Sequence, residues 1–215
     1  MSRRINTNDF EIGINRYALT SQLGPVGEKF VTVWTHGCCR NCPGCIAEGW
    51  NRTKEPRLTV SPDILAEMLL MEYGTLDGVV LSGGEPFLWS AALSEMIACL
   101  DESEEKRMGV MIYTGYSYDE LKELAKDKDD VASLLARADI IVDGSYIKSL
   151  DNSEAFRGSS NQRLIFLTDR YNEGDIVRDA KRAVTLEINC DETSMSGIPS
   201  EADKNIWNSI IKSKL

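Results

Sequence analysis

Short continuous apolar segments alternate along the chain with segments in which apolar residues recur at helical spacing. Short apolar runs, typical of buried β-strands, occupy residues 30–36, 78–81, 110–113, 139–142 and 163–167. Apolar residues at helical spacing predict helices just after Ser117 and at residues 62–73, 91–100 and 203–211. Residues 184–189 alternate apolar and polar side chains, as an edge strand does. Strands that alternate with helices predict an α/β fold with a parallel sheet, either open or curled toward a barrel.

Two of the predicted helices begin after a serine that suits the N-cap position. Ser61 precedes the helix at residues 62–73, and Ser117 precedes a helix with Leu121 and Leu124 on its apolar face. A serine oxygen at this position can accept a hydrogen bond from a free N–H of the first turn. Each serine is therefore expected to fix the residue at which its helix begins.

Length and composition restrict the class of protein. A chain of 215 residues can bury one sizeable core, and because no linker or repeat divides it, a single domain over residues 1–215 is expected. No apolar run is long enough to cross a membrane, and no apolar segment follows the basic start at residues 1–4. The net charge of −10 argues against a non-specific nucleic-acid binder, which needs a basic surface. We expect a cytoplasmic protein without a membrane or nucleic-acid partner.

Four of the six cysteines lie in one short run, residues 38–45, directly after the first predicted strand. Cys38, Cys42 and Cys45 form a C-x3-C-x2-C pattern, and Cys39 points elsewhere if those three side chains converge. Three thiolates on one loop can hold a [4Fe–4S] cluster and leave its fourth iron free for a ligand that is not protein. The spacing therefore favours an iron–sulfur cluster.

The other interpretations of the cysteines are weaker. A structural zinc site needs four ligands, usually as two pairs, and His36, Cys39, Cys99 and Cys190 form no second pair. A disulfide framework is not expected in a chain of this length without a signal peptide. Cys99 and Cys190 lie in apolar stretches and are interpreted as buried. For His36, we expect a packing or supporting role beside the cysteine loop rather than ligation.

The remaining conspicuous loops follow the other predicted strands. In parallel α/β folds, ligands bind at the carboxyl ends of the strands. Residues 82–86 (Ser-Gly-Gly-Glu-Pro), 113–116 (Tyr-Thr-Gly-Tyr) and 143–144 (Asp-Gly) would therefore share one rim with the cysteine loop. Paired glycines at 83 and 84 let a ligand approach the backbone closely. Their N–H and C=O groups can bond the charged ends of an amino acid, and Glu85 can fix a turn or face a cation, although such a segment alone is often only a strand-to-helix turn.

Two further polar side chains are candidates for ligand contact. Asp143 can accept hydrogen bonds from ribose hydroxyls or simply cap its loop. Arg157, in the polar segment 156–163, can hold a carboxylate through its planar guanidinium or belong to an ordinary surface loop.

The pairing of the Cys38, Cys42 and Cys45 pattern with the segment 82–86 resembles the radical S-adenosylmethionine (SAM) superfamily. Within that superfamily, the chain is most similar to the activating proteins of anaerobic ribonucleotide reductases. The similarity extends over nearly the whole chain and includes residues 15–17, 23–30, 36–38, 42–45, 113–116, 139–144 and 156–163.

The resemblance implies a partial (β/α)6 barrel in one radical SAM domain, with the cluster loop at residues 36–50 and no auxiliary cluster domain. It implies that a [4Fe–4S] cluster on the three cysteines binds the amino and carboxylate groups of SAM through the free iron. An external one-electron reductant such as flavodoxin or ferredoxin would reduce the cluster. Cleavage would give methionine and a 5′-deoxyadenosyl radical, which would take a hydrogen atom from a glycine of a partner anaerobic ribonucleotide reductase.

The resemblance also assigns roles to residues. Gly83, Gly84 and Glu85 would face the methionine amino group, and Asp143 and Arg157 would contact the ribose and the carboxylate. Since the cofactor carries the difficult chemistry, no side-chain nucleophile or base is needed, which agrees with the absence of a catalytic triad or carboxylate pair from the sequence.

The chain departs from the family pattern around the last cluster cysteine. Many superfamily members have an aromatic residue before it, where this chain has Gly44, and the activating proteins follow it with an aromatic residue and Asn, where this chain has Ile46 and Ala47. This departure motivates a second hypothesis, in which the same radical chemistry modifies a ribosomal peptide or a small metabolite. A third hypothesis is a non-catalytic metal-binding protein.

Overall fold

The computed structural model describes residues 11–20, 23–51, 54–152, 154–176, 182, 184–188 and 193–214. Its main sheet contains the seven strands β1 (Ile12–Leu19), β2 (Phe30–Thr35), β3 (Leu58–Val60), β4 (Gly78–Gly83), β5 (Gly109–Tyr113), β6 (Ile140–Asp143) and β7 (Arg163–Phe166). The strands lie in the order β3-β1-β2-β4-β5-β6-β7. A separate two-stranded sheet pairs β8 (Val184–Ile188) with β9 (Thr193–Gly197).

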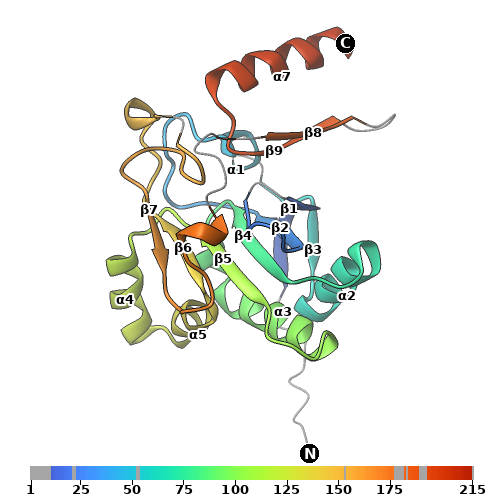
Figure 1. The fold of residues 1–215 in the computed structure, drawn as a ribbon, viewed down its shortest axis with the longest axis vertical. Helices are drawn as coiled ribbons and strands as arrows, with labels where there is room; N and C mark the ends of the chain where they lie inside the picture. Colours follow the sequence, from blue (N-terminus) through green and yellow to red (C-terminus); the bar gives the residue numbers. More distant parts are fainter. Residues whose placement is uncertain are drawn as a thin grey trace, which may run out of the picture.

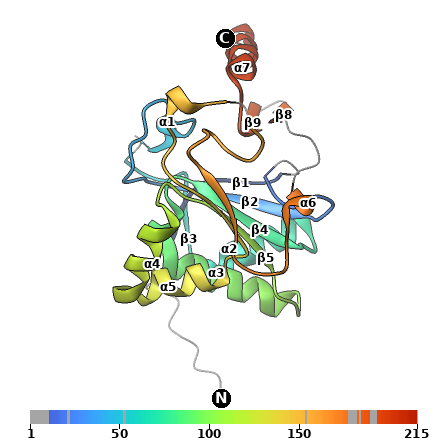
Figure 2. The same cartoon turned by 60° about the vertical axis from the view of Figure 1, so that its left-hand side comes forward.

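The helices connect these strands. They are α1 (Glu48–Asn51), α2 (Pro62–Tyr73), α3 (Ser90–Ser103), α4 (Tyr118–Asp127), α5 (Asp129–Arg137), α6 (Glu173–Ile176) and α7 (Glu201–Lys214), with 3-10 turns η2 (Pro86–Trp89) and η3 (Lys148–Leu150). Helices α2 to α5 lie along one side of the main sheet, whereas α1, the β8–β9 pair and α7 lie on the other side (Figures 1 and 2). Among the described residues, no helix has the length and apolar character that crossing a membrane requires.

The strand directions confirm an α/β fold with a mainly parallel sheet but differ from six repeated β/α units. Strands β2, β4, β5 and β6 pair in parallel, whereas β1, β3 and β7 run antiparallel to their neighbours. The strand predicted at residues 163–167 is present as β7, but it ends the parallel series because it pairs antiparallel with β6. The chain between β6 and β7 contains only the turn η3, and a parallel return needs a longer crossover that is usually a helix.

Several elements differ from the sequence-based expectations. Strands β1, β3 and β9 and helix α5 were not predicted, whereas the alternating segment at residues 184–189 contains the edge strand β8, which lies in a separate sheet with β9. Its last residue, Asn189, lies outside the described residues. Alternation identifies a half-covered strand but not the sheet to which the strand belongs.

Both faces of the parallel strands are buried, which explains their continuous apolar sequences. Val79 and Leu81 of β4 join the core under the helices, whereas Val80 between them joins a second cluster on the opposite face. Trp34 of β2 belongs to that second cluster, and Tyr113 of β5 packs against it. The opposite face therefore supplies an apolar floor beneath the loops at the carboxyl ends of the strands.

Candidate functional site

A cavity of about 460 Å³ lies at the carboxyl ends of the four parallel strands. As the sequence predicts, each of these strands contributes its following loop to the wall. The contributing residues include Cys38, Cys42 and Cys45 after β2, Ser82 to Glu85 around the end of β4, Tyr113 to Gly115 around the end of β5, and Gly144 after β6.

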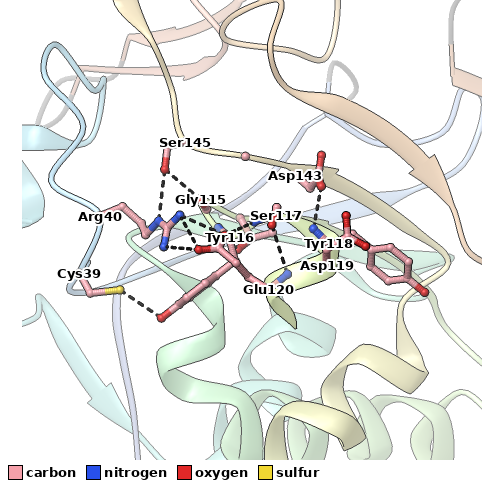
Figure 3. Close-up of polar contacts among 12 residues, drawn as sticks. Cys39, Arg40, Gly115, Tyr116, Ser117, Tyr118, Asp119, Glu120, Asp143 and Ser145 are labelled. Atoms are coloured by element: carbon pink, nitrogen blue, oxygen red, sulfur yellow. Dashed lines mark hydrogen bonds and ion pairs between the residues drawn. The ribbon is translucent and has the colours of Figure 1, made fainter. Parts of the chain in front are cut away.

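The three cysteines of the pattern all line this cavity, whereas Cys39 is not among its lining residues. Cys39 is exposed, and its Sγ lies 3.3 Å from the hydroxyl oxygen of Tyr116 (Figure 3). The five cysteines that the structure describes are unpaired, and Cys190 lies outside the described residues. Cys99 is half-buried and packs against the core under the helices.

The three cysteines that line the cavity form a donor set that suits a [4Fe–4S] cluster. Within the described residues, no three His, Cys, Asp or Glu side chains converge tightly enough for a single-ion site. A [4Fe–4S] cluster binds each thiolate through a different iron and so separates its ligands more widely than one ion does. Three soft thiols on a single loop around an open cavity have the chemistry and the space that a cluster needs.

Backbone hydrogen bonds shape the cysteine loop. The N–H of Cys45 donates to the carbonyl of Cys42 at 3.2 Å, and the N–H of Glu48 donates to the carbonyl of Cys45 at 3.2 Å. Burial raises the pKa of the Cys38 and Cys45 thiols. Because metal ligands are thiolates, cluster binding must release these protons.

His36 supports the start of the loop. Its Nδ1 lies 3.1 Å from the side-chain oxygen of Asn15, and its backbone N–H donates to the carbonyl of Gly13 at 2.8 Å. The indole N–H of Trp89 donates to the carbonyl of His36 at 2.7 Å. These contacts agree with the supporting role predicted for His36.

The Gly83–Gly84 turn packs directly on β2. Gly83 has a φ of 102°, and a Cβ there would lie 2.5 Å from the backbone nitrogen of Thr35. The N–H of Gly84 donates to the carbonyl of Thr35 and that of Glu85 to the carbonyl of Gly37, both at 2.8 Å. These two N–H groups therefore bind the end of β2 and the start of the cysteine loop.

Glu85 is fully buried, and its carboxylate is occupied by protein donors. It accepts hydrogen bonds from the Thr114 hydroxyl and the Gly115 N–H, both at 2.8 Å, and from the Phe87 N–H at 3.2 Å. Burial raises the pKa of the Glu85 carboxyl, although these hydrogen bonds oppose the rise. The side chain thus joins the loops after β4 and β5, which agrees with the predicted turn-fixing role.

Asp143 and Arg157 are not among the cavity-lining residues. The Asp143 carboxylate is buried and accepts hydrogen bonds from the Arg163 guanidinium and from the Tyr118 N–H at 2.7 Å. The Arg157 guanidinium pairs with Glu154 and donates to the carbonyl of Gln162 at 3.2 Å. The predicted ribose and carboxylate contacts of these two residues thus gain no support from the cavity.

Several cavity residues were missed by reasoning from the sequence. They are mainly cations and residues of the C-terminal elements, including Arg16, Arg40, Arg57, Tyr146, Arg182, Met195 to Pro199, Lys204 and Trp207. Arg40 had a visible signal, because it lies between two cluster cysteines. Arg182 had no such signal, because its partners lie at distant positions in the sequence. Its side chain is 2% exposed, pairs with Asp151 and donates to the backbone carbonyls of Glu154, Arg157 and Gly158.

Residues 25–165 match the family model of the 4Fe-4S single cluster domain. The chain belongs to this family. The matched range of the 4Fe-4S single cluster domain contains all three cysteines of the pattern and the strand ends that line the cavity, whereas the β8–β9 pair and α7 follow it. The predicted iron–sulfur assignment is therefore confirmed at the level of the family.

Two similar proteins extend the comparison. The chain is 29% identical over 143 residues to the anaerobic ribonucleoside-triphosphate reductase-activating protein of Enterobacteria phage T4. This alignment covers 65% of this chain and 85% of the phage protein. The predicted resemblance to such activating proteins is thereby confirmed. The crystal structure of QueE from Escherichia coli matches with a TM-score of 0.40 and 18% identity, over 52% of this chain and 55% of QueE.

Proposed function

We propose that this protein is a radical SAM enzyme that activates a partner anaerobic ribonucleotide reductase by generating a glycyl radical on it. The observation that carries the proposal is the position of Cys38, Cys42 and Cys45 around one cavity at the carboxyl ends of the parallel strands. Family membership supports the cluster, and the similarity to the T4 activating protein supports the partner. When bound, the reduced cluster would supply the electron that cleaves SAM to methionine and a 5′-deoxyadenosyl radical.

The residues of this chain would bind SAM and position it. Carbonyl oxygens of the Gly83–Gly84 turn suit the methionine ammonium, and Glu85 would shape that turn from beneath. Arg16 and Arg57 line the same cavity and suit the carboxylate. The proposal also assigns Asp143 and Arg157 to contacts with the ribose and the carboxylate of SAM.

The C-terminal elements would limit the access of water to the site. Ile198, Pro199 and Trp207 line the cavity. The elements β9 and α7 lie on the side of the main sheet opposite to helices α2 to α5 (Figure 2). A primary radical reacts with the first hydrogen donor that reaches it, so covering the cavity favours transfer from the intended glycine.

The wider proposal is one radical SAM domain over residues 1–215, with a cluster loop at 36–50, a sheet curled into a partial barrel and no auxiliary cluster domain. It includes an external reductant of the flavodoxin or ferredoxin type and a cytoplasmic setting. Fully reduced cysteines are needed for cluster assembly, which a reducing compartment provides.

The test is anaerobic reconstitution with iron and sulfide, followed by addition of SAM and a reductant. The proposed chemistry requires 5′-deoxyadenosine as a product, and the proposed partner requires a glycyl doublet in the electron paramagnetic resonance (EPR) spectrum when the reductase is added. If protein that is fully loaded with the cluster forms no 5′-deoxyadenosine, the proposed enzymatic activity is rejected. Formation of 5′-deoxyadenosine without a doublet on any glycyl-radical enzyme of the source genome would favour the peptide or metabolite hypothesis.

A further inference from the structure

Arg40 lies between the cluster cysteines Cys38 and Cys42 and contacts the loops after two other strands. Its Nη2 donates to both carboxylate oxygens of Glu120, at 3.3 and 3.2 Å, and its Nε donates to the Ser145 hydroxyl at 3.2 Å. Figure 3 shows the guanidinium held between these two groups. One side chain thus connects the cysteine loop to the start of α4 and to the chain after β6.

The partners of Arg40 are themselves fixed to the fold. Glu120 completes the capping box of α4, because its carboxylate also accepts from the Ser117 N–H while the Ser117 hydroxyl accepts from the Glu120 N–H. The Ser145 hydroxyl donates to the Gly115 carbonyl at 3.0 Å. Arg40 is therefore attached to groups whose positions are set by helix capping and by the end of β5.

The stem of Arg40 is also packed. Its guanidinium carbon lies 4.7 Å from the centre of the Tyr116 ring, and a Cβ added at Gly115 would lie 2.6 Å from the Arg40 Cγ. The absence of a side chain at Gly115 is what allows the Arg40 stem to pass. The hydroxyl group of the same Tyr116 ring contacts the Cys39 side chain.

We propose that Arg40 is a positioning residue that holds the three-cysteine loop in its cluster-binding conformation before the cluster is inserted. This inference rests on the proposed cluster-dependent function. The side chains of Arg40 and Glu120 are 25% and 46% exposed, so their ion pair is screened by water and adds little to global stability. The ion pair instead orders the loop that contains the metal ligands. Residues that orient metal ligands strongly affect how well a protein retains its metal.

The experiment compares Arg40→Ala, Arg40→Lys and Glu120→Gln with the wild-type protein and with Arg137→Ala. Arg137 is a matched control, because it pairs with Asp101 at 3.0 Å with side chains 32% and 24% exposed, and neither residue lines the cavity. The first measurement is the iodoacetamide alkylation rate of Cys38, Cys42 and Cys45 in cluster-free protein, read by peptide mass spectrometry. The second is the rate at which reconstituted protein loses iron to a chelator, together with the EPR spectrum of the reduced cluster.

Arg40→Ala is expected to raise both rates by roughly 10-fold and to broaden the EPR spectrum, while its melting temperature stays close to that of Arg137→Ala. Arg40→Lys keeps the charge and most of the aliphatic stem but loses the planar guanidinium. It should therefore recover less than half of the difference in both rates between Arg40→Ala and the wild-type protein. Glu120→Gln should resemble Arg40→Lys, since an amide still accepts the capping hydrogen bond.

Two results would overturn the inference: rates for Arg40→Ala that equal those of Arg137→Ala, or full restoration by Arg40→Lys, which would assign the effect to charge alone. If the wild-type protein takes up no cluster, the proposed function fails, and the alkylation rates of the cluster-free proteins still decide whether Arg40 orders the loop.

Discussion

Single residues set how closely the strand ends approach one another. Gly83 lies where β4 meets the start of the cysteine loop, with both a positive φ and backbone atoms of Thr35 within 3 Å of any added Cβ. Sequence reasoning found this glycine because a Gly-Gly pair after a buried strand predicts close approach. The sequence predicts the approach of a ligand, and the structure adds the close approach of the neighbouring strand β2 at a turn that also lines the cavity.

Gly83→Ala should therefore destabilise the protein severely, by about 3–4 kcal/mol, because backbone atoms cannot move aside. Gly27→Ala is the matched control, since Gly27 has a φ of 84° with nothing within 4 Å of an added Cβ. The control should lose only about 1 kcal/mol. Urea unfolding of both variants measures the difference, and equal losses would show that strain alone governs Gly83.

Asp143 illustrates a buried carboxylate whose partners the sequence did not reveal. Burial alone would raise its pKa, but hydrogen bonds from Arg163 and Tyr118 and the charge of Arg163 outweigh burial, so the pKa lies below its ordinary value of 3.8. A carboxyl whose pKa is lower in the folded state stabilises the fold above the unfolded value and loses this contribution as pH falls through the folded value.

Asp143→Asn is expected to lower the free energy of unfolding by about 2 kcal/mol at pH 7, because an amide cannot accept all of the hydrogen bonds made to the carboxylate. The difference from wild type should shrink as the pH is lowered from about 4 toward 2, where the wild-type carboxylate also becomes protonated. Urea titrations across this range are the measurement. A difference that stays constant down to pH 2 would contradict the assignment.

Helices show how far local sequence determines an element. The helix at residues 62–73 was predicted with the bounds that α2 has, and the one after Ser117 begins where α4 begins. The two serines nevertheless differ: Ser117 accepts from the Glu120 N–H, whereas Ser61 makes no capping hydrogen bond and donates to Asp63 instead. The sequence separates the two cases only through the residue three positions later, which is Glu120 after Ser117 and an isoleucine after Ser61.

Ser117→Ala should lower the free energy of unfolding by about 1 kcal/mol, as the loss of a working N-cap does. Ser61→Ala should change it by less than about 0.5 kcal/mol, since only a surface contact with Asp63 is lost. Thermal unfolding of the two variants in parallel checks this order, and a larger loss for Ser61→Ala would show that the cap assignments are reversed.

At the scale of the whole molecule, sequence reasoning gave the fold class and the common rim but not the strand directions. Short apolar runs such as residues 164–166 read alike in parallel and antiparallel strands, although β7 is only partly buried whereas the parallel strand β6 is buried throughout. The cavity wall supplied by residues 195–199 and by α7 was also unpredicted, since these segments meet the site only through the tertiary fold. Motifs within one loop were therefore easier to assign than walls built by distant segments.

Helix α7 stands apart from α2 to α5 in both views, yet Lys204 and Trp207 line the cavity (Figures 1 and 2). Deleting residues 201–215 should lower the free energy of unfolding by about 2 kcal/mol or less, a small part of a domain's total. Alkylation of Cys38 and Cys45 should become faster, because the cavity is more open. Loss of cooperative unfolding, or unchanged alkylation, would show that α7 is part of the core or does not cover the site.

The backbone conformation of Gly44, a residue of the cysteine loop that lies beside Lys148, restricts the residues that position 44 can accept during evolution. Gly44 has a φ of 77°, and a Cβ there would lie 3.2 Å from the Lys148 Cδ. A larger residue at position 44 would meet an unfavourable backbone, whereas the flexible Lys148 side chain would have to shift by only a few tenths of an ångström. The left-handed backbone at position 44 therefore preserves glycine there more strongly than the space around it does.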